Sequence, residues 1–287
     1  MSNIYSGFIV EPALYLVATP IGNLGDMTTR AAEVLQQVDV IAAEDTRHSQ
    51  KLLSHLGIRK TLIACHEHNE QKMLPQLLQR LQNGEAIALV SDAGTPLISD
   101  PGYRLVAMAH RHGIKVAPVP GACAAIAALS AAGLPTDRFV FEGFLPARQQ
   151  ARLAALRALA QESRSLVFYE SCHRIAACLR DMCEAFGESR RITFARELTK
   201  TFETIRQMTL AECLQWVQQD ANQQKGEIVL VVAGAERSEP SQAGLSQLLN
   251  VLLEELPLKQ SAALASRITG VNKNACYQLA LELKRNA

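Results

Sequence analysis

Four short segments in the first half of the chain have the composition of ligand-binding loops. Residues 19–24, 91–102 and 120–123 are rich in glycine and proline, and residues 44–47 read Glu-Asp-Thr-Arg. Glycine lets a ligand approach the backbone closely, and proline fixes the path of the chain. Backbone amides in such loops can bind the carboxylate or the ribose of a small cofactor. Tight turns are the alternative for any single loop, but four loops at one sheet edge favour a binding site.

The carboxylates in these loops are candidates for proton transfer. Glu44, Asp45, Asp92 and Asp100 are each able to accept a proton from a hydroxyl nucleophile. Arg47 can grip a phosphate, or it can pair with Asp45 and orient it. A helix N-terminus beside a surface ion pair is the alternative for residues 44–47, and turn capping is the alternative for Asp92 and Asp100. The residues alone do not select one base.

Other cofactor and metal motifs are missing or incomplete in the sequence. No Gly-x-Gly-x-x-Gly follows the first expected strand and no Walker A sequence occurs, which disfavours nicotinamide and ATP chemistry on those scaffolds. His66 and His68 flank Glu67, but no third ligand is evident. We therefore expect no metal site, and we favour a polar structural or substrate-binding role for these histidines.

Cysteine usage and hydropathy indicate the compartment. The seven cysteines are scattered and form no Cys-x-x-Cys pair, which is typical of reduced thiols in the cytoplasm. The longest apolar runs, such as residues 228–233, are too short to cross a bilayer. Residues 1–12 carry no basic residue and no long apolar stretch, unlike a secretory signal. We expect a cytoplasmic protein that makes no membrane contact.

The elements that must position the four loops alternate between strand and helix. The hydrophobic pattern predicts strands at 14–19, 38–42, 61–65, 86–90 and 115–119, and helices at 28–37, 74–82, 103–112 and 122–132. Pro75 is expected in the first turn of its helix. This alternation predicts an α/β fold with a mostly parallel sheet, in which ligands bind at the carboxyl ends of the strands.

The rest of the chain predicts a second α/β domain and a helical module. Helices are expected at 149–161, 174–186 and 210–218, and strands at 165–169, 191–196, 202–208 and 228–232. A polar linker at 235–242 precedes helices at 244–256, 258–269 and 272–284. The expected domains are 1–136, 137–236 and 243–287.

Charge is distributed unevenly along the chain, although its formal net value is only +1. Residues 257–287 contain five basic residues and one acidic residue. Two of the helices there have helix-turn-helix spacing with Gly270 in the turn. We expect an RNA-docking module, whereas a dimerisation or packing element is the alternative.

Six collinear motifs resemble the ribosomal RNA small-subunit methyltransferase I family. They lie at residues 19–24, 43–47, 88–102, 168–174, 195–200 and 225–227, and the resemblance extends over 14–283. The wider superfamily, the tetrapyrrole methylases, binds S-adenosyl-L-methionine in a cleft between two α/β domains. The resemblance implies 2'-O-ribose methylation of a cytidine in the decoding region of 16S ribosomal RNA, on the 30S subunit. It also implies a homodimer.

The motifs and the resemblance together give candidate site residues. The expected catalytic residues are Glu44, Asp45, Arg47 and Asp100. The expected cofactor-binding residues are Pro20, Gly22, Asp92, Gly94, Thr95, Pro96, Leu97, Ala122, Cys123, Tyr169, Glu170, Gly226 and Glu227. The expected RNA-binding residues are Arg174, Arg196, Lys200, Lys259, Arg267 and Lys273.

Three departures from the superfamily pattern bear on the substrate. Many members have Gly-Asp-Pro where residues 94–96 are Gly-Thr-Pro, and Pro-Gly-Pro where residues 120–122 are Pro-Gly-Ala. Cys172 stands where proline is common, so the loop after Glu170 is expected to be less rigid. The missing acidic group argues against a tetrapyrrole substrate. A small-molecule methyltransferase of the tetrapyrrole type and a non-catalytic RNA-binding assembly factor are the rival functions.

Overall fold

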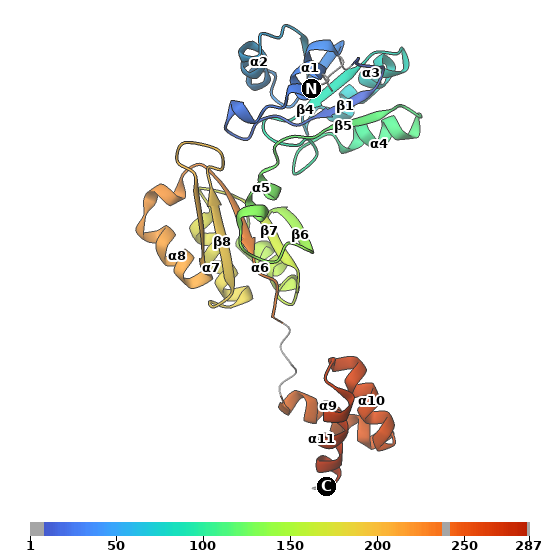
Figure 1. The fold of residues 1–287 in the computed structure, drawn as a ribbon, viewed down its shortest axis with the longest axis vertical. Coiled ribbons are helices and arrows are strands. Elements are labelled where there is room, and N and C mark those ends of the chain that lie inside the picture. Colours follow the sequence, from blue (N-terminus) through green and yellow to red (C-terminus); the bar gives the residue numbers. More distant parts are fainter. Residues whose placement is uncertain (1–8, 237–241, 286–287) are drawn as a thin grey trace, which may run out of the picture. The chain divides into compact units, whose positions relative to one another are not determined.

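The computed structural model describes residues 9–236 and 242–285 (Figure 1). The chain divides into two compact units, residues 1–234 and 235–287. The first unit contains two separate five-stranded sheets. The second unit is helical. No helix among the described residues has the length and hydropathy needed to span a membrane.

The first sheet is entirely parallel, as the sequence predicts. Its order is β3-β2-β4-β1-β5. The strands are β1 (Leu14–Val17), β2 (Val40–Ala43), β3 (Thr61–Ala64), β4 (Ile87–Val90) and β5 (Val116–Val119). All four residues of β4 are buried, because helices cover both faces of the sheet. The loops after β1, β2, β4 and β5 are the four segments singled out above, and they share the carboxyl edge.

Each face of the first sheet is covered by two helices. Helices α1 (Thr29–Gln37) and α2 (Thr46–His55) pack on one face with the short 3-10 helix η1 (Leu24–Asp26) nearby in sequence. Helices α3 (Glu70–Gln82) and α4 (Tyr103–Arg111) pack on the other face through apolar side chains such as Leu77 and Leu105. Helix α2 was not among the predicted helices.

Helix α3 begins one turn earlier than the sequence predicts. Its first residue is Glu70, so Pro75 lies inside the helix and the prediction that it occupies the first turn was wrong. The early start has a packing reason. The buried Glu70 carboxylate accepts hydrogen bonds from the backbone N–H groups of Arg104 and Leu105. Glu70 therefore caps helix α4, whose own N-cap residue Gly102 has no side chain to do so.

The second sheet is mixed and has the order β6-β7-β10-β8-β9. Its strands are β6 (Phe139–Phe144), β7 (Ser165–Ser171), β8 (Arg191–Arg196), β9 (Thr204–Thr209) and β10 (Glu227–Val232). Only the β6–β7 pair is parallel. Strand β9 confirms the extended segment expected around 202–208. Strand β6 was not predicted as a strand.

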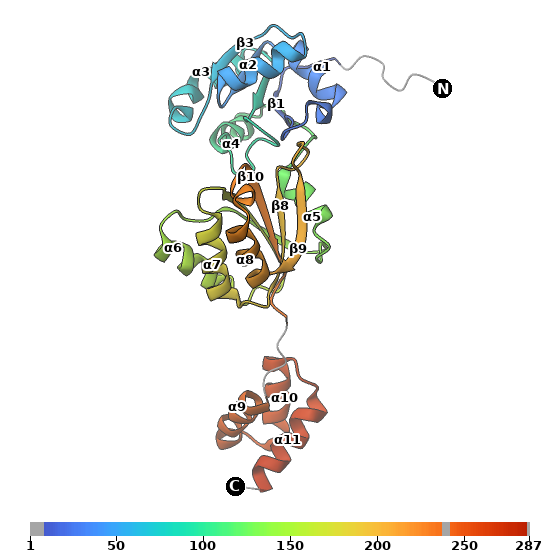
Figure 2. The same cartoon turned by 90° about the vertical axis from the view of Figure 1, so that its left-hand side faces the viewer.

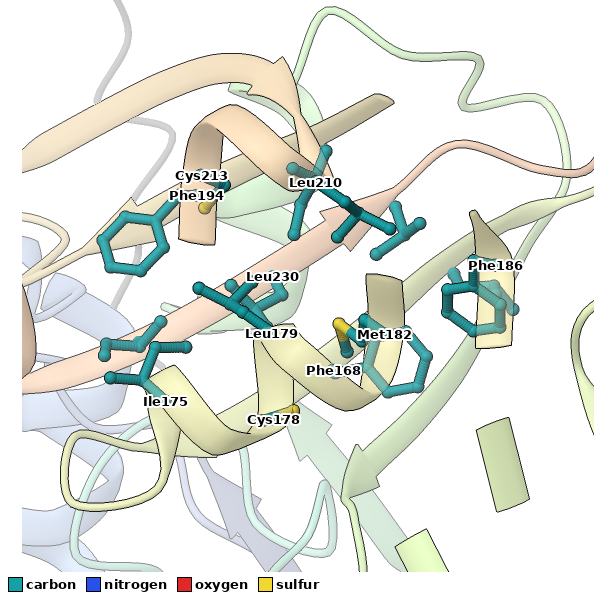
Figure 3. Packing of buried hydrophobic residues seen from close by; sticks show 14 of the residues in the cluster. Phe168, Ile175, Cys178, Leu179, Met182, Phe186, Phe194, Leu210, Cys213 and Leu230 are labelled. Atoms are coloured by element: carbon teal, nitrogen blue, oxygen red, sulfur yellow. The ribbon is translucent and has the colours of Figure 1, made fainter. Parts of the chain in front are cut away.

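One face of the second sheet carries the largest apolar core. Helices α6 (Gln149–Ala158), α7 (Ile175–Phe186) and α8 (Leu210–Gln219) cover this face, and the 3-10 helix η2 (Ala221–Gln224) follows α8. Figure 3 shows Leu179 and Met182 of α7 facing Phe168 of β7 and Leu230 of β10. Alternation along β7 and β10 places these side chains on the helix-covered face.

Helix α5 (Ala124–Ala131) covers the opposite face of the second sheet (Figure 2). It follows β5 of the first sheet, but its Ala128 and Leu129 pack with Val167 of β7 and Val231 of β10. The division into domains 1–136 and 137–236 stays a proposal, and the packing of α5 favours a boundary just before Ala124.

The C-terminal unit is a small three-helix bundle. It consists of α9 (Gln242–Glu255), α10 (Leu258–Thr269) and α11 (Lys273–Arg285) around a core that includes Leu249, Ala262 and Cys276. Gly270 ends α10 in the left-handed conformation, with φ 75°, which glycine adopts without a steric penalty. The turn expected at this residue is therefore present.

Candidate active site

A cavity of about 400 Å³ lies where loops of the first sheet meet strands β7 and β10. This volume is in the range of pockets that hold small molecules or cofactors. The cavity is lined by Ile21, Ala93, Gly94, Thr95, Ile98, Cys123, Ala124, Phe144, Tyr169, Glu170, Ser171, Cys172, His173, Leu198, Gly226, Glu227, Ile228 and Val229. Loops after β1, β4 and β5 thus contribute to a single site.

The cavity contains about half of the residues expected to bind a cofactor. Those that line it are Gly94, Thr95, Cys123, Tyr169, Glu170, Gly226 and Glu227, whereas Pro20, Gly22, Asp92, Pro96, Leu97 and Ala122 do not. The apolar part of the wall, formed by Ile21, Phe144, Leu198 and Val229, was not predicted from the sequence. Such residues have no distinctive chemistry, and only the tertiary fold shows that they face a cavity.

Hydrogen bonds between loops fix the part of the cavity wall that Gly94 and Thr95 form. Thr19 and Gly94 form an isolated antiparallel bridge, in which each backbone N–H donates to the other's carbonyl at 2.9 and 3.0 Å. The Thr95 hydroxyl donates to the Ala122 carbonyl at 3.0 Å. Gly94 has φ 85°, and a Cβ there would lie 3.3 Å from the side chain of Ile21. The loops after β1, β4 and β5 are therefore held to one another.

Tyr169 supports the cavity wall from β7. Its hydroxyl accepts a hydrogen bond from the Ala125 backbone N–H at 3.1 Å, at the start of α5. Its ring meets Phe141 and Phe144 edge to face, at centroid distances of 5.0 and 5.6 Å. Burial raises the pKa of Tyr169, and the Cys123 and Asp100 charges add to this effect. Tyr169 is therefore a neutral packing residue at physiological pH, and Asp100 lies within electrostatic reach of the cavity wall.

The next residue, Glu170, points to the helix-covered face. It lies two positions after Phe168 on β7, so the two share a face. One carboxylate oxygen accepts hydrogen bonds from the Ser171 N–H at 2.6 Å and from Arg174 at 2.7 Å, and the side chain is fully buried. Arg174 also donates to the Leu145 carbonyl. Arg174 thus holds the loops beside the cavity together, with 27% of its side chain exposed, and its expected contact with an RNA phosphate stays a prediction.

Arg196 is likewise placed inside the protein. Only 8% of its surface is exposed. Its guanidinium donates to the Gln223 side chain, to the Thr204 hydroxyl, and to the carbonyls of Phe202 and Lys225. A guanidinium with its donors occupied in this way is fixed in place within the protein. Arg196 joins β8 to the segments that border the cavity, and its expected contact with RNA stays a prediction that nothing in the structure tests.

The turn that Arg196 anchors packs against Gly226. Glu197 and Thr199 in this turn have φ 52° and 68°, conformations that cost energy for non-glycine residues. One Glu197 oxygen accepts hydrogen bonds from the Glu227 N–H at 2.9 Å and from the Lys200 ammonium at 2.8 Å. A Cβ at Gly226 would lie 2.3 Å from that oxygen. This position therefore requires glycine.

Lys200 connects the turn to the first sheet. Its ammonium forms ion pairs with Glu197 and with Glu227, the second at 3.1 Å. Its aliphatic stem covers Gly22, where a Cβ would lie 2.4 Å from Lys200 Cγ. Gly22 thus has a packing role beside the cavity instead of lining it, and Lys200 is engaged within the protein.

Three carboxylates gather at the ends of β2 and β4. Asp92 accepts a hydrogen bond from the Asp45 N–H at 3.0 Å, and Glu44 accepts one from the Asp92 N–H at 3.5 Å. Burial raises the pKa of Glu44, and the charges of Asp100 and Asp92 raise it further. Burial also raises the pKa of Asp100, partly offset by a hydrogen bond from Ser91. Raised carboxyl pKa values are what a proton-accepting group needs.

Asp45 has a different environment. Its carboxylate caps helix α2 by accepting from the Arg47 N–H at 2.8 Å, and it pairs with the Arg47 guanidinium, also at 2.8 Å. The Arg47 hydrogen bonds hold the pKa of Asp45 well below its ordinary value. The alternative of a helix N-terminus with a surface ion pair is therefore present in the structure, and Asp45 is a poorer base than Glu44 or Asp100.

The remaining RNA candidates lie in the C-terminal unit. Lys259, Arg267 and Lys273 are all exposed, and they form no ion pair among the described residues. No group of three or more histidine, cysteine, aspartate or glutamate side chains in residues 9–236 and 242–285 is placed to hold a metal ion.

The fold and the cavity define a tetrapyrrole-type methylase. Residues 13–214 match the family described as Tetrapyrrole (Corrin/Porphyrin) Methylases. The crystal structure of the methyltransferase CobJ has the same fold, with a TM-score of 0.58 and 19% identity over 78% of this chain and 94% of that chain. The structure of a Thermus thermophilus uroporphyrin-III C-methyl transferase complexed with S-adenyl homocysteine gives a TM-score of 0.53 and 19% identity, covering 77% and 97% of the two chains.

Closer relatives specify the family. Ribosomal RNA small subunit methyltransferase I of Pseudomonas aeruginosa is 57% identical over 272 residues, which cover 94% of this chain and 96% of the relative. The protein of the same name in Escherichia coli O157:H7 is 57% identical over 270 residues, covering 94% of each chain. Residues 239–284 match the RsmI C-terminal HTH domain. The chain belongs to the ribosomal RNA small subunit methyltransferase I family.

Proposed function

We propose that the protein uses S-adenosyl-L-methionine to methylate the ribose 2'-hydroxyl of a cytidine in the decoding region of 16S ribosomal RNA, within the 30S subunit. The observation that carries the proposal is the cavity to which the motif loops contribute, in a chain 57% identical to relatives named Ribosomal RNA small subunit methyltransferase I. The methyltransferase with the same fold that was crystallised with S-adenyl homocysteine supports the choice of cofactor.

The cavity fits this cofactor by shape and chemistry. Gly94 and Gly226, both with positive φ, line the cavity, and a Cβ at either position would press on a neighbouring side chain, that of Ile21 or Glu197. Ile21, Leu198 and Val229 offer an apolar surface for an adenine ring. Backbone groups of the loops after β4 and β5 would hold the polar parts. The cofactor would supply a methyl group already activated on a sulfonium, so the protein needs mainly to align donor and acceptor.

The residues of the chain would then manage the acceptor proton. A ribose hydroxyl is a weak nucleophile at neutral pH, and a positioned base helps it react. Asp100 is the preferred base because its charge acts on both Tyr169 in the cavity wall and Glu44 in the carboxylate cluster, raising the pKa of each. Burial, and to a lesser extent the Asp92 charge, raise the pKa of Asp100, which favours its acceptance of a proton. Arg47, which is exposed, would steer the phosphate backbone while it orients Asp45.

Partners and location are part of the same proposal. The exposed cations of the C-terminal unit, Lys259, Arg267 and Lys273, would dock on ribosomal RNA. We further propose a cytoplasmic homodimer without membrane contact. Two of these cations, Lys259 and Arg267, lie on α10, and Lys273 lies on α11, so both helices would contact the RNA.

A direct test uses labelled S-adenosyl-L-methionine and 30S subunits from cells that lack the modification. We expect label in 16S ribosomal RNA, at the 2'-oxygen of a single cytidine in the decoding region. The Asp100→Asn variant should bind the cofactor normally by calorimetry but transfer at least 100-fold more slowly. Labelling of a corrinoid or uroporphyrinogen, or cofactor binding with no label in any RNA, would contradict the proposal.

A further inference from the structure

A polar and aromatic surface continues from the carboxylate cluster along the carboxyl edge of the first sheet. The loop after β4 runs from Gly94 and Ile98 in the cavity, through Asp100, to Tyr103 at the start of α4. Three residues of chain span at most about 11 Å. The Cα atom of Tyr103 therefore lies within about 11 Å of that of Asp100, the residue that the proposed function assigns to the acceptor hydroxyl.

Tyr103 is unusually exposed for an aromatic side chain. Its exposed fraction is 74%, and no hydrogen bond or ring contact engages it among the described residues. The adjacent Arg104 is also exposed, and its guanidinium forms no ion pair in the described chain. An aromatic ring beside an unpaired arginine is the combination that binds an unstacked base together with its phosphate.

The loop after β3 borders the same surface. The backbone N–H of Arg104 donates to Glu70 at 3.1 Å, which ties the start of α4 to the segment that contains His66 and His68. Strand β3 ends at Ala64, so both histidines lie in the loop. Their rings meet edge to face at 6.1 Å. The Nδ1 atom of His66 is buried and has no hydrogen-bond partner in the described structure.

That ring nitrogen points to a missing polar partner. Buried polar atoms in proteins are normally hydrogen-bonded, and an unpaired one is costly. Because this atom is buried, a phosphate or a ribose hydroxyl bound along this edge would supply the partner only after the His66 side chain turns outward.

We propose that Tyr103, Arg104, His66 and His68 form the surface that receives the RNA strand flanking the target ribose. Tyr103 stacks on a base next to the target, Arg104 binds its phosphate, and His66 binds a polar group of the sugar-phosphate backbone. The target nucleotide is thereby held with its ribose at the carboxylate cluster. This inference rests on the proposed function, since it concerns the RNA of that reaction.

The test compares substitutions at matched positions. Tyr103→Ala removes the ring, and Tyr103→Phe keeps it. Phe139→Ala removes another exposed aromatic ring, which lies at the end of β6 opposite the cavity. Arg104→Ala is paired with Arg111→Ala, an exposed arginine at the other end of α4. Each protein is assayed for KM and kcat with unmodified 30S subunits and for cofactor affinity by calorimetry.

We expect Tyr103→Ala to raise the KM for 30S subunits at least about tenfold, because stacking contributes that much per base. Tyr103→Phe, Phe139→Ala and Arg111→Ala should match wild type. Arg104→Ala should raise KM and reduce the salt dependence of binding by about one charge. Cofactor affinity should be unchanged in all five variants.

Two results would overturn the inference, and they differ from failure of the proposed function. Equal KM values for Tyr103→Ala, Phe139→Ala and wild type would exclude stacking by Tyr103. A loss of cofactor affinity in Tyr103→Ala as large as its loss in kcat/KM would make the residue a support of the cavity. If wild-type protein methylates no RNA at all, the proposed function itself is wrong and this inference falls with it.

Discussion

Replacement of Gly226 by alanine should disturb the cavity wall, because the added methyl group would meet the Glu197 side chain. Gly226 has φ 80°, which costs an alanine about 1–2 kcal/mol. The new Cβ would lie 2.3 Å from a Glu197 oxygen and 2.4 Å from its Cδ. Glu197 must then move and give up a hydrogen bond from Glu227 or from Lys200, a further loss of about 1.5–3 kcal/mol. The expected destabilisation is about 2.5–5 kcal/mol.

The assay separates the backbone effect from the steric one. Gly84 has φ 86° and no atom within 4 Å of the position of a Cβ. Gly84→Ala should therefore cost only the backbone part, about 1–2 kcal/mol by urea denaturation, and leave cofactor affinity unchanged. Gly226→Ala should in addition weaken S-adenosyl-L-methionine binding at least about tenfold by calorimetry, because a 1.4 kcal/mol loss at the wall has that effect.

A double variant tests the assigned cause. In Glu197→Ala, the atoms that obstruct the new methyl group are absent, so adding Gly226→Ala should cost about as little as Gly84→Ala. The reasoning is refuted if Gly226→Ala alone is no more destabilising than Gly84→Ala and binds the cofactor as wild type does.

Three further predictions follow from buried charges. Arg196→Lys should weaken cofactor binding about tenfold and leave kcat at saturation unchanged. The reason is that one ammonium cannot replace a guanidinium that donates to four groups. Unchanged cofactor affinity would contradict a positioning role for Arg196. Glu44→Gln should raise the urea midpoint at pH 7, because burial raises the pKa of Glu44 and so penalises its ionised form in the folded state. That gain should disappear as the pH falls below about 4, the ordinary carboxyl range, and a gain independent of pH would exclude this cause. Asp181→Ala should cost about 3–5 kcal/mol in the same assay, since it leaves Arg152 buried and unpaired, and the Asp181→Ala, Arg152→Met double variant should be the more stable of the two.

The first sheet was predicted well because each of its strands and helices is specified by a short, continuous segment of the sequence. Short apolar runs separated by capped helices can form only a parallel sheet covered on both faces, and the carboxyl ends then follow from chain direction. The glycines at 94 and 226 were also recognisable, since positive φ and close approach are requirements of single positions. Both features were therefore visible without knowledge of tertiary contacts.

The contacts that charged residues make within the protein were not predicted. Arg174 and Arg196 were expected at a phosphate, and both bond within the protein to carbonyls and side chains that come near only after folding. Helix α2 was missed because polar residues dominate it and only Ser49 and Leu53 are buried. Strand β6 was missed because a bulge near Gly143 interrupts its alternation.

The course of the chain through helix α5 has a consequence for how the enzyme responds to its ligand. The chain passes from β5 of the first sheet to α5 on the second sheet through residues 120–123, and Cys123 of that connection lines the cavity. The joint between the two halves is thus also a wall of the binding site. A ligand that fills the cavity must restrict the motion of residues 120–123. Ligand binding and the mobility of this connection are therefore thermodynamically linked. The amide protons of α5 beyond Ala124, the one residue of this helix that lines the cavity, should report binding by slower exchange with solvent.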